Sequence, residues 1–139
     1  MALTTYDTDA IAAGRGKAIG LPDGAAVYVQ GEPADCAYIV TRGRVRLGNG
    51  VPIEVLHPGE IFGEMELLDG GPRCTGAVAV GATEVLAIER DLFEVLVRDD
   101  PDFAMTLLRL TARRLRAAMT KLDRATGPRG PQLRLIAGG

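Results

Sequence analysis

A glutamate and an arginine on either side of a glycine-rich loop are the residues whose types and spacing suggest chemistry. Glu64 follows Gly63 directly, and Arg73 comes nine residues after Glu64. Gly63 lets the backbone approach a ligand closely, and the amides after it open a helical turn whose N-terminus attracts phosphate. The planar fork of an arginine matches the paired oxygens of a phosphate, whereas an ionised glutamate only accepts hydrogen bonds and suits a sugar hydroxyl. Together these groups fit a ribose joined to a phosphate.

The elements that position this loop are expected to be short strands and one short helical turn. The leucines at 67–68 fit one or two turns of helix, because the Asp-Gly-Gly-Pro run at 69–72 ends it. From residue 17 to about residue 89, short β-forming runs alternate with turns, and about eight strands at such spacing predict a β-barrel or β-roll. The clearest strands are expected at residues 25–30, 36–41, 44–47, 51–56, 75–80 and 83–89.

Two helices are expected after this β region. Asp91 and Glu94 have capping-box-like spacing and predict a helix that runs to about Arg98. The pair Asp100-Pro101 then predicts a second helix, which extends to about Arg124. Apolar residues recur along it at three-four spacing, which usually indicates core packing, although a heptad-like seam could also form a homodimer. The stripe contains Leu108, Thr111, Leu115, Ala118 and Leu122, and Phe103, Leu107 and Leu110 widen it.

Two blocks of this sequence resemble the cyclic nucleotide-binding domain family, which includes the catabolite activator protein and the regulatory subunit of protein kinase A. Residues 62–73, with Phe-Gly-Glu, Leu-Leu and Pro-Arg in order, look like the phosphate-binding cassette of that family. Residues 31–45 resemble its early strand-turn-strand segment, and the order and separation of the two blocks also fit. The resemblance covers roughly residues 17–124.

This resemblance implies a fold and a domain organisation. The fold would be mainly β with α: an eight-stranded β-roll, similar to a double-stranded β-helix or jelly roll, with a short cassette helix and two C-terminal helices. The domain would occupy residues 17–124, after a short lead over residues 1–16 and before a flexible tail over residues 125–139. The chain would then be a stand-alone module.

The resemblance also implies the ligand and the residues around it. Arg73 would hold the cyclic phosphate of cyclic AMP or cyclic GMP, Glu64 would accept the ribose 2′-hydroxyl, and the amides after Gly63 would complete the cradle. The long helix would close over the base, in a region close to Arg114. The other residues expected at the ligand are Met65, Glu66, Cys74 and Thr75, with Leu47 and Ile53 as an apolar base slot.

Some positions depart from the family pattern, so the resemblance does not decide between cyclic AMP and cyclic GMP. Glu66 stands where a small residue is usual, and Thr75 replaces a usual alanine. Ala118 and Met119 occupy a helix region where some members place hydroxyls for the base. Glu66 either faces the phosphate, where its charge would repel the ligand, or points to solvent or pairs with an arginine of the long helix such as Arg114. Another interpretation is that Glu64 and Arg73 simply pair with each other.

Composition disfavours enzymatic and membrane functions. A metalloenzyme with a similar barrel commonly needs two or more histidines, whereas this chain has only His57 and contains no serine. Cys36 and Cys74 have no metal-ligand spacing and fit the reducing cytoplasm. No apolar run is long enough to span a bilayer, and no secretory signal begins the chain. We therefore expect a cytoplasmic protein that is not an enzyme and needs no metal or cofactor.

Charge is distributed unevenly along the chain and bears on its partners. Residues 1–100 hold 8 basic and 16 acidic side chains, whereas residues 101–139 hold 8 basic and 2 acidic ones. One explanation is that a basic C-terminal helix packs against an acidic β domain. The other is that the basic residues form a surface that binds an acidic partner. Too few residues follow Arg124 for a helix-turn-helix, so we expect no DNA-binding domain in this chain. A protein effector of unknown identity would bind the long helix in a way that depends on the ligand. The alternative is an interaction domain that has no ligand and docks an acidic partner through its basic C-terminal helix.

Overall fold

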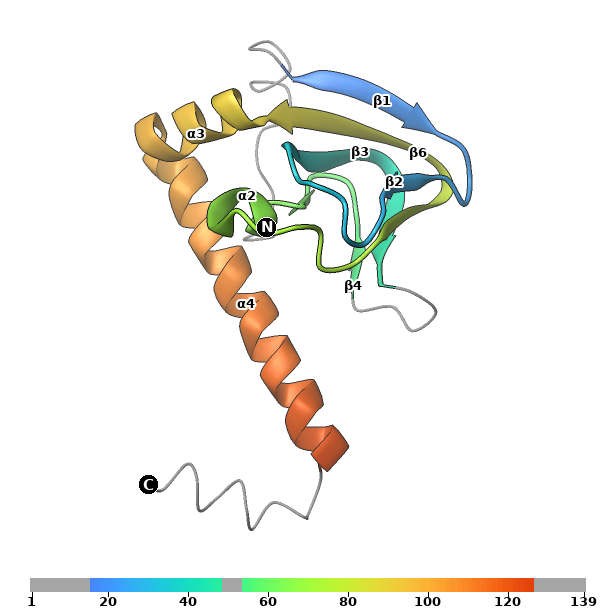
Figure 1. Ribbon diagram of the computed structural model, residues 1–139, viewed down its shortest axis with the longest axis vertical. Helices are drawn as coiled ribbons and strands as arrows, with labels where there is room; N and C mark the ends of the chain where they lie inside the picture. The colour runs from blue at the N-terminus through green and yellow to red at the C-terminus, as the bar shows by residue number, and fades with distance from the viewer. Residues whose placement is uncertain (1–15, 49–53, 127–139) are drawn as a thin grey trace.

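The computed structural model describes residues 16–48 and 54–126, which form a β-roll followed by two helices (Figure 1). All strand pairs among these residues are antiparallel, and the main sheet has the order β1-β6-β3-β4, while β2 pairs with β6 and β5 pairs with β3. The strands are β1 (Lys17–Leu21), β2 (Ala26–Tyr28), β3 (Cys36–Leu47), β4 (Glu54–Leu56), β5 (Ile61–Phe62) and β6 (Ala77–Glu89). The β-roll predicted from the sequence is confirmed.

Two long strands each contain a pair of the strands expected from the sequence. β3 continues through Gly43, and β6 continues through Gly81, both with positive φ (74° and 72°). The register between β3 and β6 shifts next to Gly43, so the ribbon bends there without ending. A Cβ atom on Gly43 would lie 2.4 Å from the carbonyl oxygen of Ala82, whereas a Cβ on Gly81 would meet nothing within 4 Å. Only glycine therefore fits the bend of β3.

The hydrophobic core consists of two clusters of buried residues. One cluster fills the roll, where the rings of Tyr38 and Phe62 stack with their centroids 5.4 Å apart. The other joins the roll to the helices through residues such as Ile39, Ile61 and Leu67. Because Leu67 belongs to α2 (Met65–Asp69), the cassette helix is held by the same cluster that anchors the C-terminal helices.

The helix termini follow the expected local signals with one exception. α2 ends at Gly70, which has φ 79° and accepts the left-handed conformation of a C-cap. α3 (Arg90–Asp99) begins one residue before Asp91, so the prediction of Asp91 as its N-cap is wrong; Glu89 holds that position without a side-chain cap bond. α4 (Pro101–Thr126) starts as predicted, because Asp100 Oδ1 accepts from the amides of residues 102 and 103 at 3.1 and 3.2 Å.

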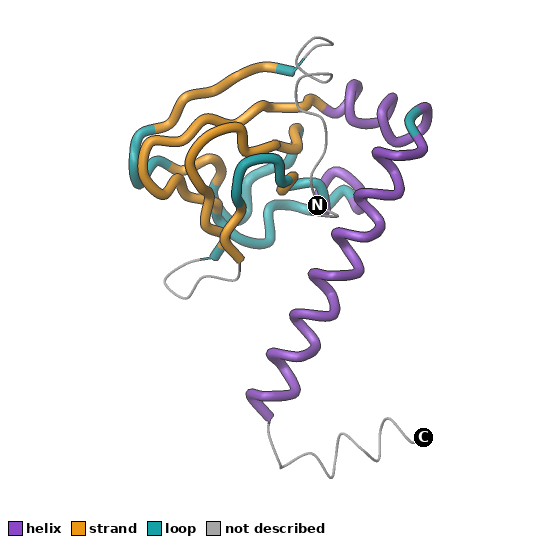
Figure 2. Tube along the Cα trace, turned by 180° about the vertical axis from the view of Figure 1, so that it is seen from behind, coloured by secondary structure: helices purple, strands orange, loops and turns teal. Residues whose placement is uncertain are grey.

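The face of α4 that packs against the roll differs from the expected leucine stripe. Phe103, Leu107 and Leu110 are at most 4% exposed and lie in the core. Leu108, Leu115 and Leu122 are 60–64% exposed in this single chain, so core packing is the wrong interpretation of that stripe. Both views of the molecule show the C-terminal half of α4 extending beyond the roll (Figures 1 and 2). Within the described part of the chain, no helix is long and apolar enough to cross a membrane.

Candidate functional site

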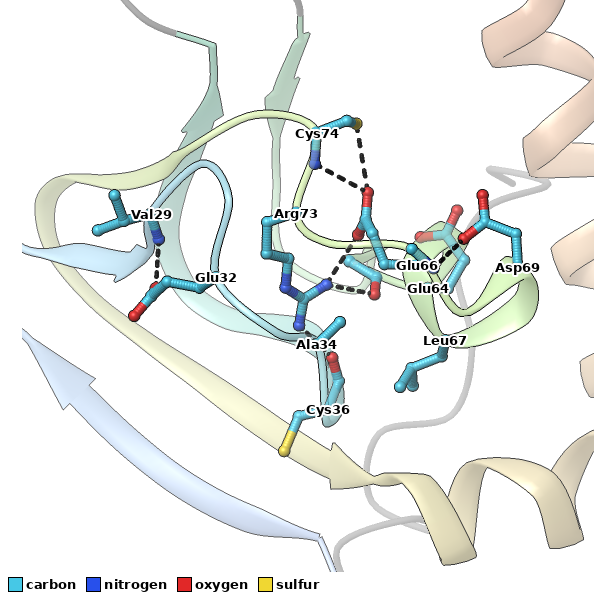
Figure 3. Close-up of polar contacts among 12 residues, drawn as sticks. Val29, Glu32, Ala34, Cys36, Glu64, Glu66, Leu67, Asp69, Arg73 and Cys74 are labelled. Atoms are coloured by element: carbon cyan, nitrogen blue, oxygen red, sulfur yellow. Dashed lines mark hydrogen bonds and ion pairs between the residues drawn. The ribbon is translucent and has the colours of Figure 1, made fainter.

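Arg73 is held rigidly inside the cassette. Its side chain is 1% exposed, and its Nη1 donates to the carbonyl oxygen of Gly63 at 2.7 Å and to Glu66 Oε1 at 2.9 Å. Its Nη2 donates to the carbonyl oxygen of Cys36 at 2.5 Å (Figure 3). The guanidinium carbon lies 4.0 Å from the ring centroid of Tyr28, a cation–π contact that fixes the plane of the group. The arginine is therefore oriented before any ligand arrives.

The carboxylate of Glu66 contacts Arg73 and Cys74. One oxygen accepts from Arg73, and the other accepts from the thiol of Cys74 at 3.2 Å and lies 3.5 Å from the Cys74 amide nitrogen. Partial burial raises the pKa of the Cys74 thiol, and the hydrogen bond to Glu66 and the charge of that carboxylate raise it further. Figure 3 shows these contacts converging on one carboxylate from the loop that leads into β6.

Glu64 is fully buried and pairs with an arginine from the long helix. Arg114 Nη1 donates to both carboxylate oxygens of Glu64, at 3.0 and 2.8 Å, and Nη2 donates to the carbonyl oxygen of Ile61 at 2.7 Å. Arg114 Nε also lies 2.9 Å from Glu54 Oε1, close enough for an ion pair although it is not aligned as a hydrogen bond. Burial raises the pKa of Glu54, and the charge of Arg114 opposes that rise. One side chain thus ties α4 to the cassette, to β5 and to β4.

Comparison with known proteins identifies the family. The family model described as "Cyclic nucleotide-binding domain" matches residues 19–100, more than half of the chain. The chain belongs to the cyclic nucleotide-binding domain family. The cyclic AMP receptor protein of Thermus thermophilus is 44% identical over 108 residues, covering 73% of this chain and 50% of that protein.

Two further comparisons agree with this membership. The CRP-like cAMP-activated global transcriptional regulator of Mycobacterium tuberculosis is 32% identical over 110 residues, covering 75% of this chain and 49% of the regulator. The crystal structure of the Thermus thermophilus catabolite activator protein superposes with a TM-score of 0.74 at 37% identity, covering 88% of this chain and 60% of that structure. The chain spans about half the length of the curated relatives it matches. These relatives are mainly regulators, although some matched proteins are enzymes.

Within this cyclic nucleotide-binding domain, the structure separates the alternatives left open for the two acids. Glu64 does not pair with Arg73; it pairs with Arg114. Glu66 neither points to solvent nor reaches Arg114, because its carboxylate contacts Arg73 and Cys74. The ion pair between Glu66 and Arg73 was not predicted from the sequence.

The remaining residues expected at the ligand differ in their exposure. Met65 is 47% exposed on α2, and Thr75 is half-buried just before β6. Leu47 is partly buried and packs against the cluster inside the roll, while Ile53 lies outside the described residues. Contact of these residues with a ligand stays a prediction.

Several groups in the site were missed by sequence reasoning. Tyr28 and Glu54 come from strands that carry no distinguishing pattern around them, and the carbonyl oxygens of Cys36 and Ile61 are backbone groups that no motif reports. Only the sheet pairing and the docking of α4 bring them to the arginines. Among the described residues, no group of three or more His, Cys, Asp or Glu side chains could hold a metal ion.

Proposed function

We propose that this domain binds cyclic AMP or cyclic GMP, with the cyclic phosphate on Arg73 and the ribose 2′-hydroxyl on Glu64. The observation that carries the proposal is the fully buried carboxylate of Glu64 directly after Gly63, together with the buried guanidinium of Arg73, which donates to the carbonyl oxygen of Gly63. A Cβ atom on Gly63 would lie 3.0 Å from Arg73 Nη1 and 3.3 Å from the ring of Tyr28, at φ 76°. A glycine here therefore lets Arg73 and Tyr28 pack close to the backbone. The family membership supports the choice of ligand class.

We further propose that α4 carries the signal of the ligand. Glu64, the residue assigned to the ribose, is already bound by Arg114 from α4. A hydroxyl that donates to Glu64 must share or displace that contact, so the position of α4 depends on the occupancy of the site. A ligand shifts such an equilibrium only by its differential affinity for the two positions of the helix. A protein effector would read the helix, and the domain would act as a sensor without catalysis.

Binding and helix response can be measured together. Titration calorimetry with cyclic AMP and cyclic GMP should show saturable binding of at least one of them, with 5′-AMP as the non-cyclic control. Amide hydrogen exchange over residues 111–124 should then slow at saturating nucleotide, while exchange in α3 serves as the internal reference. Unchanged exchange over residues 111–124 at saturation would reject α4 as the signalling element.

A ligand-free interaction domain is the competing function. Arg109, Arg113 and Arg116 are exposed on α4 and would suit an acidic partner. The ion pairs of Arg73 with Glu66 and of Arg114 with Glu64 are also what a domain without a ligand would retain. The relatives favour nucleotide binding over this alternative. Absence of binding to both cyclic nucleotides in the calorimetry would favour the interaction domain.

We also propose that the exposed stripe of α4 pairs with a second copy of the chain. Leu108, Leu115 and Leu122 are seven residues apart and more than half exposed, the spacing of one position of a heptad. Analytical ultracentrifugation should give twice the monomer mass of 14.7 kDa. Leu115→Glu should yield monomers, whereas Ala117→Glu, which makes the same charge change on the opposite side of the helix, should leave the dimer intact. A monomeric wild-type protein at high concentration would contradict this pairing.

A further inference from the structure

The donors around Arg73 form an oxyanion site that already holds an anion from the same chain. The guanidinium Nη1 and the thiol of Cys74 donate to the carboxylate of Glu66, one to each oxygen. The Cys74 amide nitrogen lies 3.5 Å from the second of these oxygens. A fixed cation with neighbouring backbone and side-chain donors is the usual chemistry of phosphate recognition. Glu66 therefore occupies the place that the proposed function gives to the cyclic phosphate.

The Glu66 carboxylate lies in an enclosed site from which another anion could displace it. The Glu66 side chain is 9% exposed, and Arg73 is 1% exposed, so their ion pair is largely shielded from water. Nε of Arg73 is buried and, within the described residues, has no hydrogen-bond partner. Gly63 and Cys36 hold the arginine through their carbonyl oxygens whether or not Glu66 stays.

We propose that Glu66 is an internal competitor for the phosphate of the ligand and sets the affinity threshold of this domain. The nucleotide phosphate must displace the Glu66 carboxylate from Arg73 and Cys74 before it can bind. This inference rests on the proposed function for the identity of the displacing ligand. It concerns a position where the family pattern has a small side chain, so the competitor is a property of this chain.

The physical consequence is a ligand affinity reduced by the cost of breaking a charge-assisted hydrogen bond. Such a bond in a shielded site corresponds to about a tenfold change in affinity or more. Moving the carboxylate toward the exposed side of α2 would let it be hydrated, whereas leaving it beside the phosphate would place two like charges together. Either movement of the carboxylate reduces the free energy of ligand binding. A domain with a small residue at position 66 does not have this cost.

The test compares four proteins: wild type, Glu66→Gln, Glu66→Ala and Asp69→Asn. Asp69 lies on the same short helix and is exposed, and its Oδ1 accepts a hydrogen bond from the Gly71 amide at 2.8 Å. Asp69→Asn therefore removes the same charge outside the anion site. Calorimetry with cyclic AMP and cyclic GMP should show at least about tenfold tighter binding for both Glu66 variants. Asp69→Asn should change the affinity by less than about twofold. If Glu66→Ala fails to fold, Glu66→Gln keeps the shape of the side chain and carries the test.

A second readout does not depend on nucleotide binding. Sulfate stabilises proteins in general by exclusion from their surface, but it should raise the melting temperature of Glu66→Ala more than that of wild type, because only the variant leaves the donors of Arg73 and Cys74 vacant. Alkylation of Cys74, followed by peptide mass spectrometry, should also be faster in Glu66→Gln, since removal of the charge lowers the pKa of that thiol. Cys36, whose pKa burial raises to about 11, is the internal control.

The outcomes separate this inference from the proposed function. Equal nucleotide affinity in wild type and the Glu66 variants, or weaker binding in the variants, would overturn the competitor and make Glu66 a structural partner of Arg73. Equal sulfate stabilisation together with unchanged Cys74 alkylation would overturn it as well. Selective stabilisation by sulfate without nucleotide binding in any variant would support Glu66 as the occupant of the anion site and reject the cyclic nucleotide as its ligand.

Discussion

Arg114→Ala is expected to detach α4 from the roll and to destabilise the domain by about 3–5 kcal/mol, the typical cost of breaking a buried ion pair by removing one partner. The reason is Glu64, which is 0% exposed and would keep a charge with no cation against it. The carbonyl oxygen of Ile61 would lose its donor at the same time. Urea unfolding would measure the loss of stability, and hydrogen exchange over residues 103–124 would show whether the helix opens before the roll.

The control for this change is Arg113→Ala. Arg113 is exposed on the neighbouring position of α4, so its replacement removes the same charge and side chain without uncovering Glu64. In a Glu64→Gln background, Arg114→Ala should cost markedly less, because no buried charge remains to be left alone. Equal losses in the two backgrounds would show that the ion pair between Arg114 and Glu64 does not hold α4.

Arg73→Ala is expected to abolish nucleotide binding and also to destabilise the domain by about 3–5 kcal/mol. Binding should fall because a charge-assisted partner of the phosphate is removed, which costs about 2–5 kcal/mol by analogy with buried interfacial pairs. Stability should fall because Glu66, Gly63 and Cys36 all lose a donor in the interior. From the sequence alone, Arg73 would be a ligand residue whose loss leaves the fold intact; its burial gives it a structural role as well.

Two variants separate these effects. Arg73→Ala combined with Glu66→Ala leaves no unpaired carboxylate and should recover part of the stability without recovering binding. Arg44→Ala, at an exposed arginine of β3, should change neither quantity by more than about 0.5 kcal/mol. Stability should be followed by denaturant unfolding at the temperature of the calorimetry. Full nucleotide affinity in folded Arg73→Ala would remove Arg73 from the site.

The two acids of the cassette are each neutralised by one arginine. Each acid near Gly63 has its own cation: Glu64 is bound by Arg114 from α4, and Glu66 is bound by Arg73 from the loop before β6. Under the proposed function, ligand binding at either acid would exchange an existing ion pair for a new contact. The stability of the domain and its affinity for the nucleotide would then depend on the same side chains.

The sequence by itself determined the fold class, the position of the cassette and the start of α4. These features depend on local signals: strand and turn spacing along the roll, Gly70 at the end of α2, and the Asp100-Pro101 pair before α4. Such signals act between residues a few positions apart, so they can be read along the chain. Glu64 and Arg73 were recognised for the same reason, because both lie in one short block.

The pairing of the charges and the buried face of α4 were decided only by the tertiary structure. Arg114 and Glu64 are fifty residues apart, and nothing local distinguishes that arginine from its exposed neighbours Arg113 and Arg116. The apolar residues of α4 fit two overlapping stripes, and the contact with Phe93 of α3 and the roll selects the one that contains Phe103. Helical periodicity defines faces but not their neighbours. The partner of each face is set by the packing of the whole domain, which also places the Glu66 carboxylate against the guanidinium of Arg73.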